Sequence, residues 1–241
     1  MMILSRKSNF ICCIFSLFLL LTACNNGTTE KNYPGIDESE YDAKTRTLKD
    51  LRDNQVYKTT TIGTQIWMAQ NLNFNTADGF CYYETPENCK IYGSLYIWSA
   101  AMDSAGVFSN NSKKCGYGKL CSAKEPIRGI CPKGWHLPSK AEFNILIEAT
   151  GGDNVAGKVL KSSTGWESGN GTDDFGFSAQ ASGERYYKGD FSNLGKCSSL
   201  WSTTEENDTF VYDMYLSYDY DSAILTSLSK YSAQSIRCIK D

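Results

Sequence analysis

The clearest alternation of side chains lies between Phe210 and Tyr220. On one face fall Phe210, Tyr212, Met214, Leu216, Tyr218 and Tyr220, and on the other Val211, Asp213, Tyr215, Ser217 and Asp219. A period of two is that of a β-strand, and a mixed second face is typical of an antiparallel strand with one side in water. We therefore expect the Tyr215 face to be exposed and the Phe210 face to join the core.

A helical period follows the segment Cys131–Pro138. Its apolar positions are Phe143, Leu146 and Ile147, spaced i, i+3 and i+4. Ser139 and Glu142 have the spacing of a capping box, and Gly151-Gly152 favours a left-handed stop. These signals predict a short amphipathic helix from Ser139 to the glycine pair.

Shorter patterns predict the remaining elements. Val56–Ile62 and Gln65–Ala69 are β-prone and flank Gly63-Thr64, a pair suited to the type II′ turn of a β-hairpin. Tyr92–Met102 has a helical stripe. Further expected elements are a helical turn at Ala156–Lys161, strands at Phe175–Ala179, Ile224–Tyr231 and Gln234–Ile239, and a surface loop at Asn110–Arg128. The order predicts an α+β fold with short helices packed on an antiparallel sheet.

The first residues have the composition of a lipoprotein signal peptide. Arg6 and Lys7 precede the apolar run Phe10–Leu21, which is shorter than the ~20 apolar residues that span a bilayer. Leu21-Thr22-Ala23-Cys24 has the form of a lipobox. We therefore expect residues 1–23 to be removed, Cys24 to be lipidated, and the protein to reach the outer membrane, because Asn25 is not the aspartate of an inner-membrane retention signal.

The composition divides the rest of the chain into two parts. Residues 24–53 are polar and lack periodicity, so we expect a lipidated cysteine followed by a flexible spacer. Residues 54–241 hold the predicted elements, and we expect them to form one domain.

The cysteines indicate an oxidising compartment. Cys12 and Cys13 lie in the leader and Cys24 carries lipid, which leaves seven of the ten, an odd number. The expected disulfides are Cys81 with Cys89, Cys115 with Cys121, and Cys131 with Cys238. Cys197 is then unpaired, although its pairing with Cys131 or Cys238 stays open.

Charge and residue types exclude several functions. The net charge is −3 and no basic block is present, which argues against nucleic acid as a partner. The single histidine, His136, and the absence of any C-x2-C or C-x4-C pair argue against a metal site. Adjacent acids at Asp173-Asp174 and Glu205-Glu206 are typical of solvated loops, so no catalytic residue and no cofactor are predicted.

Exposed aromatic side chains are the remaining candidates for ligand contact. The chain has 15 Tyr and 5 Trp, and the tryptophans lie in segments expected to be core. The candidate ligand-binding residues are Tyr186, Tyr187, Glu205, Asp213, Tyr215 and Asp219. An aromatic plane flanked by acidic acceptors, as at Tyr215, suits a sugar ring.

Several segments also resemble a known family in the expected order. They are Ile62–Leu72, Tyr92–Trp98, Cys131–Pro138, Phe177–Ala179, Trp201–Glu205 and Arg237–Asp241. Together they resemble the Fibrobacter succinogenes major paralogous domain, and Ser182–Arg185 departs from its pattern of paired glycines. The resemblance implies an envelope module and, more distantly, a C-type lectin-like fold.

The expected function is therefore that of a non-catalytic, disulfide-stapled binding module. It is carried by a lipid-anchored outer-membrane protein, with polysaccharide or another envelope component as its partner. The alternatives are an enzyme related to the formylglycine-generating sulfatase-modifying proteins, which share the C-type lectin-like fold, and a purely structural envelope protein. Fold alone does not choose among them.

Overall fold

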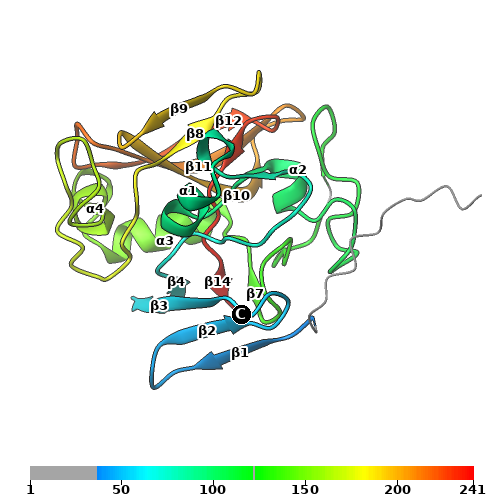
Figure 1. Cartoon of the computed structure of the whole chain (residues 1–241), viewed down its shortest axis with the longest axis horizontal. Coiled ribbons are helices and arrows are strands. Elements are labelled where there is room, and N and C mark those ends of the chain that lie inside the picture. Colours follow the sequence, from blue (N-terminus) through cyan, green and yellow to red (C-terminus); the bar gives the residue numbers. More distant parts are fainter. Residues whose placement is uncertain (1–36, 122) are drawn as a thin grey trace, which may run out of the picture. The chain divides into compact units, whose positions relative to one another are not determined.

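Two sheets and several short helices make up the part of the chain that the computed structural model describes, residues 37–121 and 123–241 (Figure 1). These residues belong to the unit Tyr33–Asp241. The predicted signal peptide and the lipidation at Cys24 lie outside the described residues. Within the described residues, no helix is long and apolar enough to cross a membrane.

The first sheet has six strands in the order β1-β2-β3-β4-β14-β7. Their bounds are β1 Ser39–Asp42, β2 Thr47–Asp50, β3 Val56–Ile62, β4 Gln65–Met68, β7 Trp135–His136 and β14 Ile239–Lys240. The β3–β4 hairpin is formed as expected, with Ile62 opposite Gln65. Gly63 has φ +58°, which a glycine adopts without steric cost.

The second sheet follows the order β12-β11-β10-β8-β13-β6-β5, with β9 paired to β8. Its strands are β5 Gly79–Phe80, β6 Leu95–Ile97, β8 Ser182–Arg185, β9 Phe191–Leu194, β10 Cys197–Glu205, β11 Phe210–Ser217, β12 Ala223–Ser229 and β13 Ala233–Gln234. The helices are α1 Pro86–Tyr92, α2 Trp98–Ala101, α3 Lys140–Ala149 and α4 Asp153–Leu160, with a 3-10 turn η1 at Tyr82–Glu84.

The expected capped helix is α3. The Ser139 hydroxyl accepts from the Glu142 amide at 3.2 Å, and the Glu142 carboxylate accepts from the Ser139 amide at 2.7 Å. The apolar stripe of α3 packs with α4 on one face of the β10–β11–β12 sheet. The buried residues there include Phe143, Leu146, Leu160, Met214 and Leu216. The prediction of a short amphipathic helix is confirmed.

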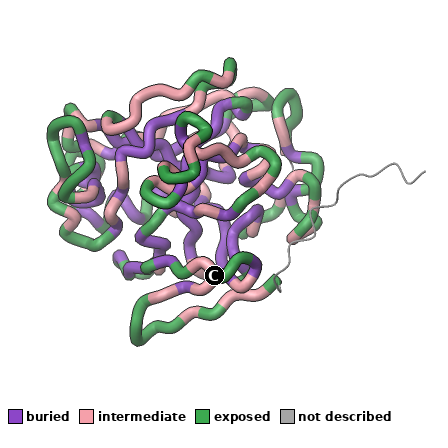
Figure 2. The backbone as a smooth tube through the Cα atoms, viewed as in Figure 1, coloured by how far each residue is buried: buried purple, intermediate pink, exposed green. Residues whose placement is uncertain are grey.

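A second group of buried hydrophobic side chains surrounds the disulfide between Cys131 and Cys238, whose Cα atoms are 5.9 Å apart. Trp98, Trp135 and Trp201 are buried in this cluster. Figure 2 marks the buried segments in the interior of the described unit. The structure also contains the expected Cys81–Cys89 and Cys115–Cys121 disulfides, and Cys197 is free and buried.

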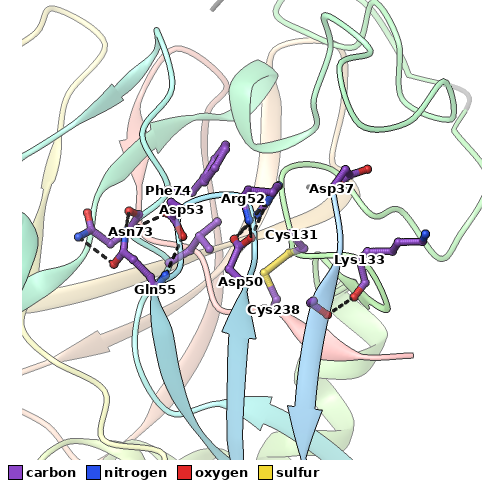
Figure 3. A network of polar contacts seen from close by, with 12 residues as sticks. Asp37, Asp50, Arg52, Asp53, Gln55, Asn73, Phe74, Cys131, Lys133 and Cys238 are labelled. Atoms are coloured by element: carbon purple, nitrogen blue, oxygen red, sulfur yellow. Dashed lines mark hydrogen bonds and ion pairs between the residues drawn. A yellow bond between two sulfur atoms is a disulfide. The ribbon is translucent and has the colours of Figure 1, made fainter. Parts of the chain in front are cut away.

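The predicted spacer at residues 24–53 is wrong at its C-terminal end. β1 and β2 lie within it, and β2 pairs with β3 through Leu48 and Tyr57. Asp50 is fully buried, and its carboxylate accepts from Arg52 Nε at 2.9 and 3.1 Å and from Arg52 Nη2 at 2.6 Å, which compensates the buried charge (Figure 3). The domain therefore begins before residue 54.

Three local predictions also fail. The expected strand Gln234–Ile239 is divided between β13 in the second sheet and β14 in the first. The helical stripe at Tyr92–Met102 is strand β6 followed by the single turn α2, because β6 pairs with both β5 and β13. Phe175–Ala179 forms no strand beyond the isolated bridge between Lys161 and Ala179. At β6 long-range backbone pairing outweighs the local helical pattern. At Phe175–Ala179 a single bridge is too little backbone pairing to form a strand.

Candidate ligand-binding groove

A groove of about 390 Å³ opens where the β8–β9 hairpin meets the ends of β11 and β12. We call it the tyrosine groove. Its lining residues are Tyr117, Tyr186, Tyr187, Thr209, Phe210, Ser227, Leu228, Ser229, Tyr231 and Ser232. None of these side chains carries a charge at neutral pH. The groove therefore presents aromatic planes and hydroxyl groups.

Aromatic side chains are exposed at its rim. Tyr187 is 61% exposed, Tyr231 53% and Tyr117 44%. The rings of Tyr117 and Tyr231 stack at 22° with centroids 4.1 Å apart. Tyr186 is fixed by Asn193, whose amide donates to the Tyr186 hydroxyl at 3.4 Å and to Glu184 at 2.7 Å. Exposed aromatic rings that are held in place are available to a ligand at a low entropic cost.

A buried ion pair positions Tyr117. The Lys230 ammonium is fully buried, 2.5 Å from a Glu205 carboxylate oxygen. It also donates to the Lys119 carbonyl at 2.8 Å, and the second Glu205 oxygen accepts from the Cys121 amide at 2.7 Å. The loop closed by Cys115 and Cys121 is thus bound to the end of strand β10 and to the residue that follows β12. Tyr117 lies on this loop and reaches the groove because of it.

The structure brings together some of the predicted site residues and separates others. Tyr186 and Tyr187 line the tyrosine groove. Glu205 does not, because Lys230 and the Cys121 amide occupy both of its carboxylate oxygens. Asp219 is exposed on the segment after β11 and accepts a hydrogen bond from the Ser217 hydroxyl.

The expectation of a water-exposed face on β11 is wrong. Val211 and Asp213 are fully buried, because the second face of β11 is covered as well: Val211 packs in the cluster that contains Trp98 and Trp201. The Asp213 carboxylate accepts from the Thr226 hydroxyl at 2.7 Å, and burial raises its pKa to about 6. Tyr215 is half-buried, and burial raises its pKa. Asp213 and Tyr215 are therefore not a sugar platform.

Three aromatic residues of the groove lie outside the predicted site. Phe210 is expected in the core but is 40% exposed, because it begins β11 where the strand leaves the covered part of the sheet. Tyr117 lies in the loop closed by the Cys115–Cys121 disulfide, and Tyr231 directly follows Lys230 in the chain. The closed Cys115–Cys121 loop is the only sequence signal pointing to Tyr117.

His136 has a structural environment. Its Nε2 lies 2.8 Å from Glu142 and its Nδ1 lies 2.6 Å from Asp241. Burial lowers its pKa, but hydrogen bonds to the two carboxylates outweigh this effect, so the pKa is raised. The imidazole therefore joins the capping box of α3 to the chain's last residue.

The other reactive groups are similarly engaged or covered. Asp173 accepts from the Ser178 amide at 2.6 Å. Burial raises the pKa of the Cys197 thiol, which disfavours the nucleophilic thiolate. Among residues 37–121 and 123–241, no group of three His, Cys, Asp or Glu side chains could hold a metal ion.

These features define a sheet-rich α+β domain with short helices, three disulfides and an uncharged aromatic groove. The chain matches the family model described as the Fibrobacter succinogenes major domain over residues 60–240, and it belongs to this family. No curated protein matches it. No solved structure matches it either.

Proposed function

We propose that this protein is an outer-membrane lipoprotein whose domain binds polysaccharide in the tyrosine groove without chemically changing it. The observation that carries the proposal is the groove lining of five aromatic rings with hydroxyl side chains and no charge. Binding sites for small molecules share this composition of apolar planes with a few polar groups.

A sugar ring suits this lining for two reasons. Its C–H faces are weakly positive and pack on the negative faces of aromatic rings, as on Tyr187 and Tyr231. Its hydroxyl groups can exchange hydrogen bonds with the Ser229 hydroxyl, and they can donate to the Thr209 hydroxyl, whose own proton goes to Asp208 at 3.0 Å. The opening to solvent leaves room for a polymer to continue past the bound residue.

The remaining parts of the proposal concern fold and location. The short helices on an antiparallel sheet, and the disulfide from the segment before α3 to the segment before β14, support a C-type lectin-like fold. The lipobox at Cys24 supports attachment to the outer membrane by lipid. Membrane fractionation of Cys24→Ala tests this: wild type should sediment with membranes and the variant should not.

Glycan binding tests the function directly. We expect the full chain, purified in detergent, to bind at least one member of an array of plant and bacterial polysaccharides. Tyr187→Ala and Tyr231→Ala should each weaken this binding about three- to tenfold, since an aromatic stack contributes roughly 0.5–1.5 kcal/mol. Isothermal titration calorimetry measures the change.

The control variant is Phe175→Ala, which removes an aromatic side chain that is 36% exposed and lies outside the groove. It should bind like wild type. Absence of any bound polysaccharide would contradict the proposed function. Binding that survives both tyrosine substitutions would place the site elsewhere on the domain.

A further inference from the structure

Arg185 differs from the other arginines that are wholly or partly buried. Arg52 and Arg128 each form an ion pair with an aspartate, at 2.6 and 2.5 Å. Arg237 donates to the Asn71 side chain and to the Ser178 carbonyl, both at 2.8 Å. Within the described ranges, the Arg185 guanidinium has no ion pair and no hydrogen-bond acceptor, and its Nε is buried without a partner.

Aromatic rings surround this guanidinium. Its central carbon lies 4.1 Å from the ring centroid of Phe80 and 5.7 Å from that of Phe191. Phe191 is the cross-strand partner of Arg185 in the β8–β9 hairpin. Cation–π attraction compensates part of the cost of holding this charge away from water, but it leaves the N–H donors without oxygen partners.

The neighbouring carboxylate does not neutralise Arg185. Glu184 is adjacent in β8, so its side chain points to the opposite face of the strand. Glu184 also accepts a hydrogen bond from Asn193 at 2.7 Å. The positive charge of Arg185 is therefore available to an anion from outside.

The guanidinium reaches the turn of the hairpin. A side-chain carbon built on Gly189 would come within 3.1 Å of Arg185 Nη2, so the charged end lies against this turn. Arg185 is partly exposed. Tyr186 and Tyr187, which line the tyrosine groove, belong to the same turn. A polymer lying in the groove and crossing the turn would meet Arg185.

An exposed ring flanks this position. Tyr83 is 65% exposed, and its ring centroid lies 5.8 Å from that of Phe191. The Cys81–Cys89 disulfide closes the loop that carries it, and Tyr83 holds a left-handed backbone conformation with φ +53°. We call Phe80, Tyr83, Arg185 and Phe191 the Arg185 patch.

We propose that the Arg185 patch binds the carboxylate of an acidic sugar in the same polysaccharide that occupies the tyrosine groove. A guanidinium offers two parallel N–H donors that match the two oxygens of a carboxylate, and Tyr83 supplies a plane for the sugar ring. This inference rests on the proposed function and deepens it: the preferred polymer contains uronic acid residues.

Polygalacturonate and its fully methyl-esterified form test the inference, because they share a backbone and differ in charge. The full chain in detergent should bind the acidic polymer about tenfold more tightly than the ester at low salt, as expected for a charge-assisted hydrogen bond. This preference should shrink as salt is raised. Calorimetry with both polymers gives the ratio.

Substitutions then locate the effect. Arg185→Gln should abolish the preference for the acid while leaving the affinity for the ester within about twofold of wild type, and Arg185→Lys should retain part of the preference. Arg46→Gln is the matched control, because Arg46 is exposed in the turn between β1 and β2. It should keep the full preference.

The outcomes separate this inference from the proposed function. Equal binding of acid and ester by wild type, or a preference that survives Arg185→Gln, would overturn the Arg185 site. The groove would still stand if Tyr187→Ala weakened binding of the ester. If neither polymer nor any other polysaccharide bound, the Arg185 site and the proposed function would both be overturned. If Arg185→Gln fails to fold, the affinities of wild type and Arg185→Lys for the acidic and the esterified polymer still test the Arg185 site.

Discussion

At the scale of single residues, some carboxylates that are removed from solvent have a cationic partner and one, Asp213, does not. Asp50 is buried and Glu205 nearly so, each beside a cation, so their charges are compensated. The Asp213 carboxylate accepts a hydrogen bond from the Thr226 hydroxyl, and within the described part of the chain its other oxygen has no partner. An uncompensated buried carboxylate costs stability whenever it is ionised.

Asp213 should therefore make the domain less stable as pH rises. Burial raises its pKa from 3.8 to about 6 in the folded state, so the folded protein holds this proton more tightly than the unfolded chain. The cost is absent below about pH 3.8, grows through about pH 6 and is complete above it. Asp213→Asn should raise the free energy of unfolding at pH 7 by up to about 3 kcal/mol.

Urea unfolding at pH 7 and at pH 3.5 measures this effect. The gain from Asp213→Asn should shrink toward zero at the lower pH, where the aspartate is already protonated. Asp174→Asn, at an exposed acid, is the control and should change little at either pH. A destabilised Asp213→Asn at pH 7 would contradict the argument.

At the scale of elements, the groove depends on contacts between segments far apart in the chain. The loop closed by Cys115 and Cys121, the β8–β9 hairpin and the segment after β12 each supply part of its wall. The pair between Lys230 and Glu205 links two of these segments. Because this ion pair is removed from solvent, loss of either charge should lower the free energy of unfolding of the domain.

Lys230→Met should lower the free energy of unfolding by about 3–5 kcal/mol, because it leaves the Glu205 carboxylate unpaired and nearly buried. Adding Glu205→Gln should restore much of this loss. The exposed pair of Lys133 and Glu38 is the control, and Lys133→Met should cost less than about 1 kcal/mol. Equal effects at the two pairs in denaturant melts would refute the role of burial.

Across the whole domain, the Cys131–Cys238 disulfide joins the segment before β7 to the segment before β14, and these two strands pair with each other. The bridge spans 107 residues and includes most of the second sheet. It therefore restricts the unfolded chain far more than the two short disulfides do.

Replacing Cys131 and Cys238 together by alanine should lower the free energy of unfolding by about 4–5 kcal/mol in the chain-entropy estimate. The Cys81→Ala/Cys89→Ala pair, which opens a loop with a separation of 8, should cost only about 2–3 kcal/mol. Denaturant unfolding of both double variants gives the comparison. A larger loss from the short loop would contradict the entropic explanation.

The sequence by itself determined the features that depend on neighbours in the chain. Ser139 and Glu142 predicted the start of α3, and Gly63 predicted the β3–β4 turn, because caps and tight turns are formed by residues a few positions apart. Cysteine spacing likewise indicated the short disulfide loops. Tyr186 and Tyr187 were predicted as candidate ligand residues because they lie between Gly183 and Gly189, where a loop exposes aromatic side chains.

Only the tertiary structure decided which faces are covered and which distant residues meet. The alternation in β11 cannot reveal that hydrophobic clusters cover both of its faces, so the burial of Asp213 was missed. The polar composition of residues 39–50 hid two strands: β2 pairs with β3, β1 pairs with β2, and the buried Arg52 holds Asp50 at the end of β2. Tyr117, Tyr187 and Tyr231 share a groove because of long-range backbone pairing and a buried ion pair, and such contacts leave no local pattern in a sequence.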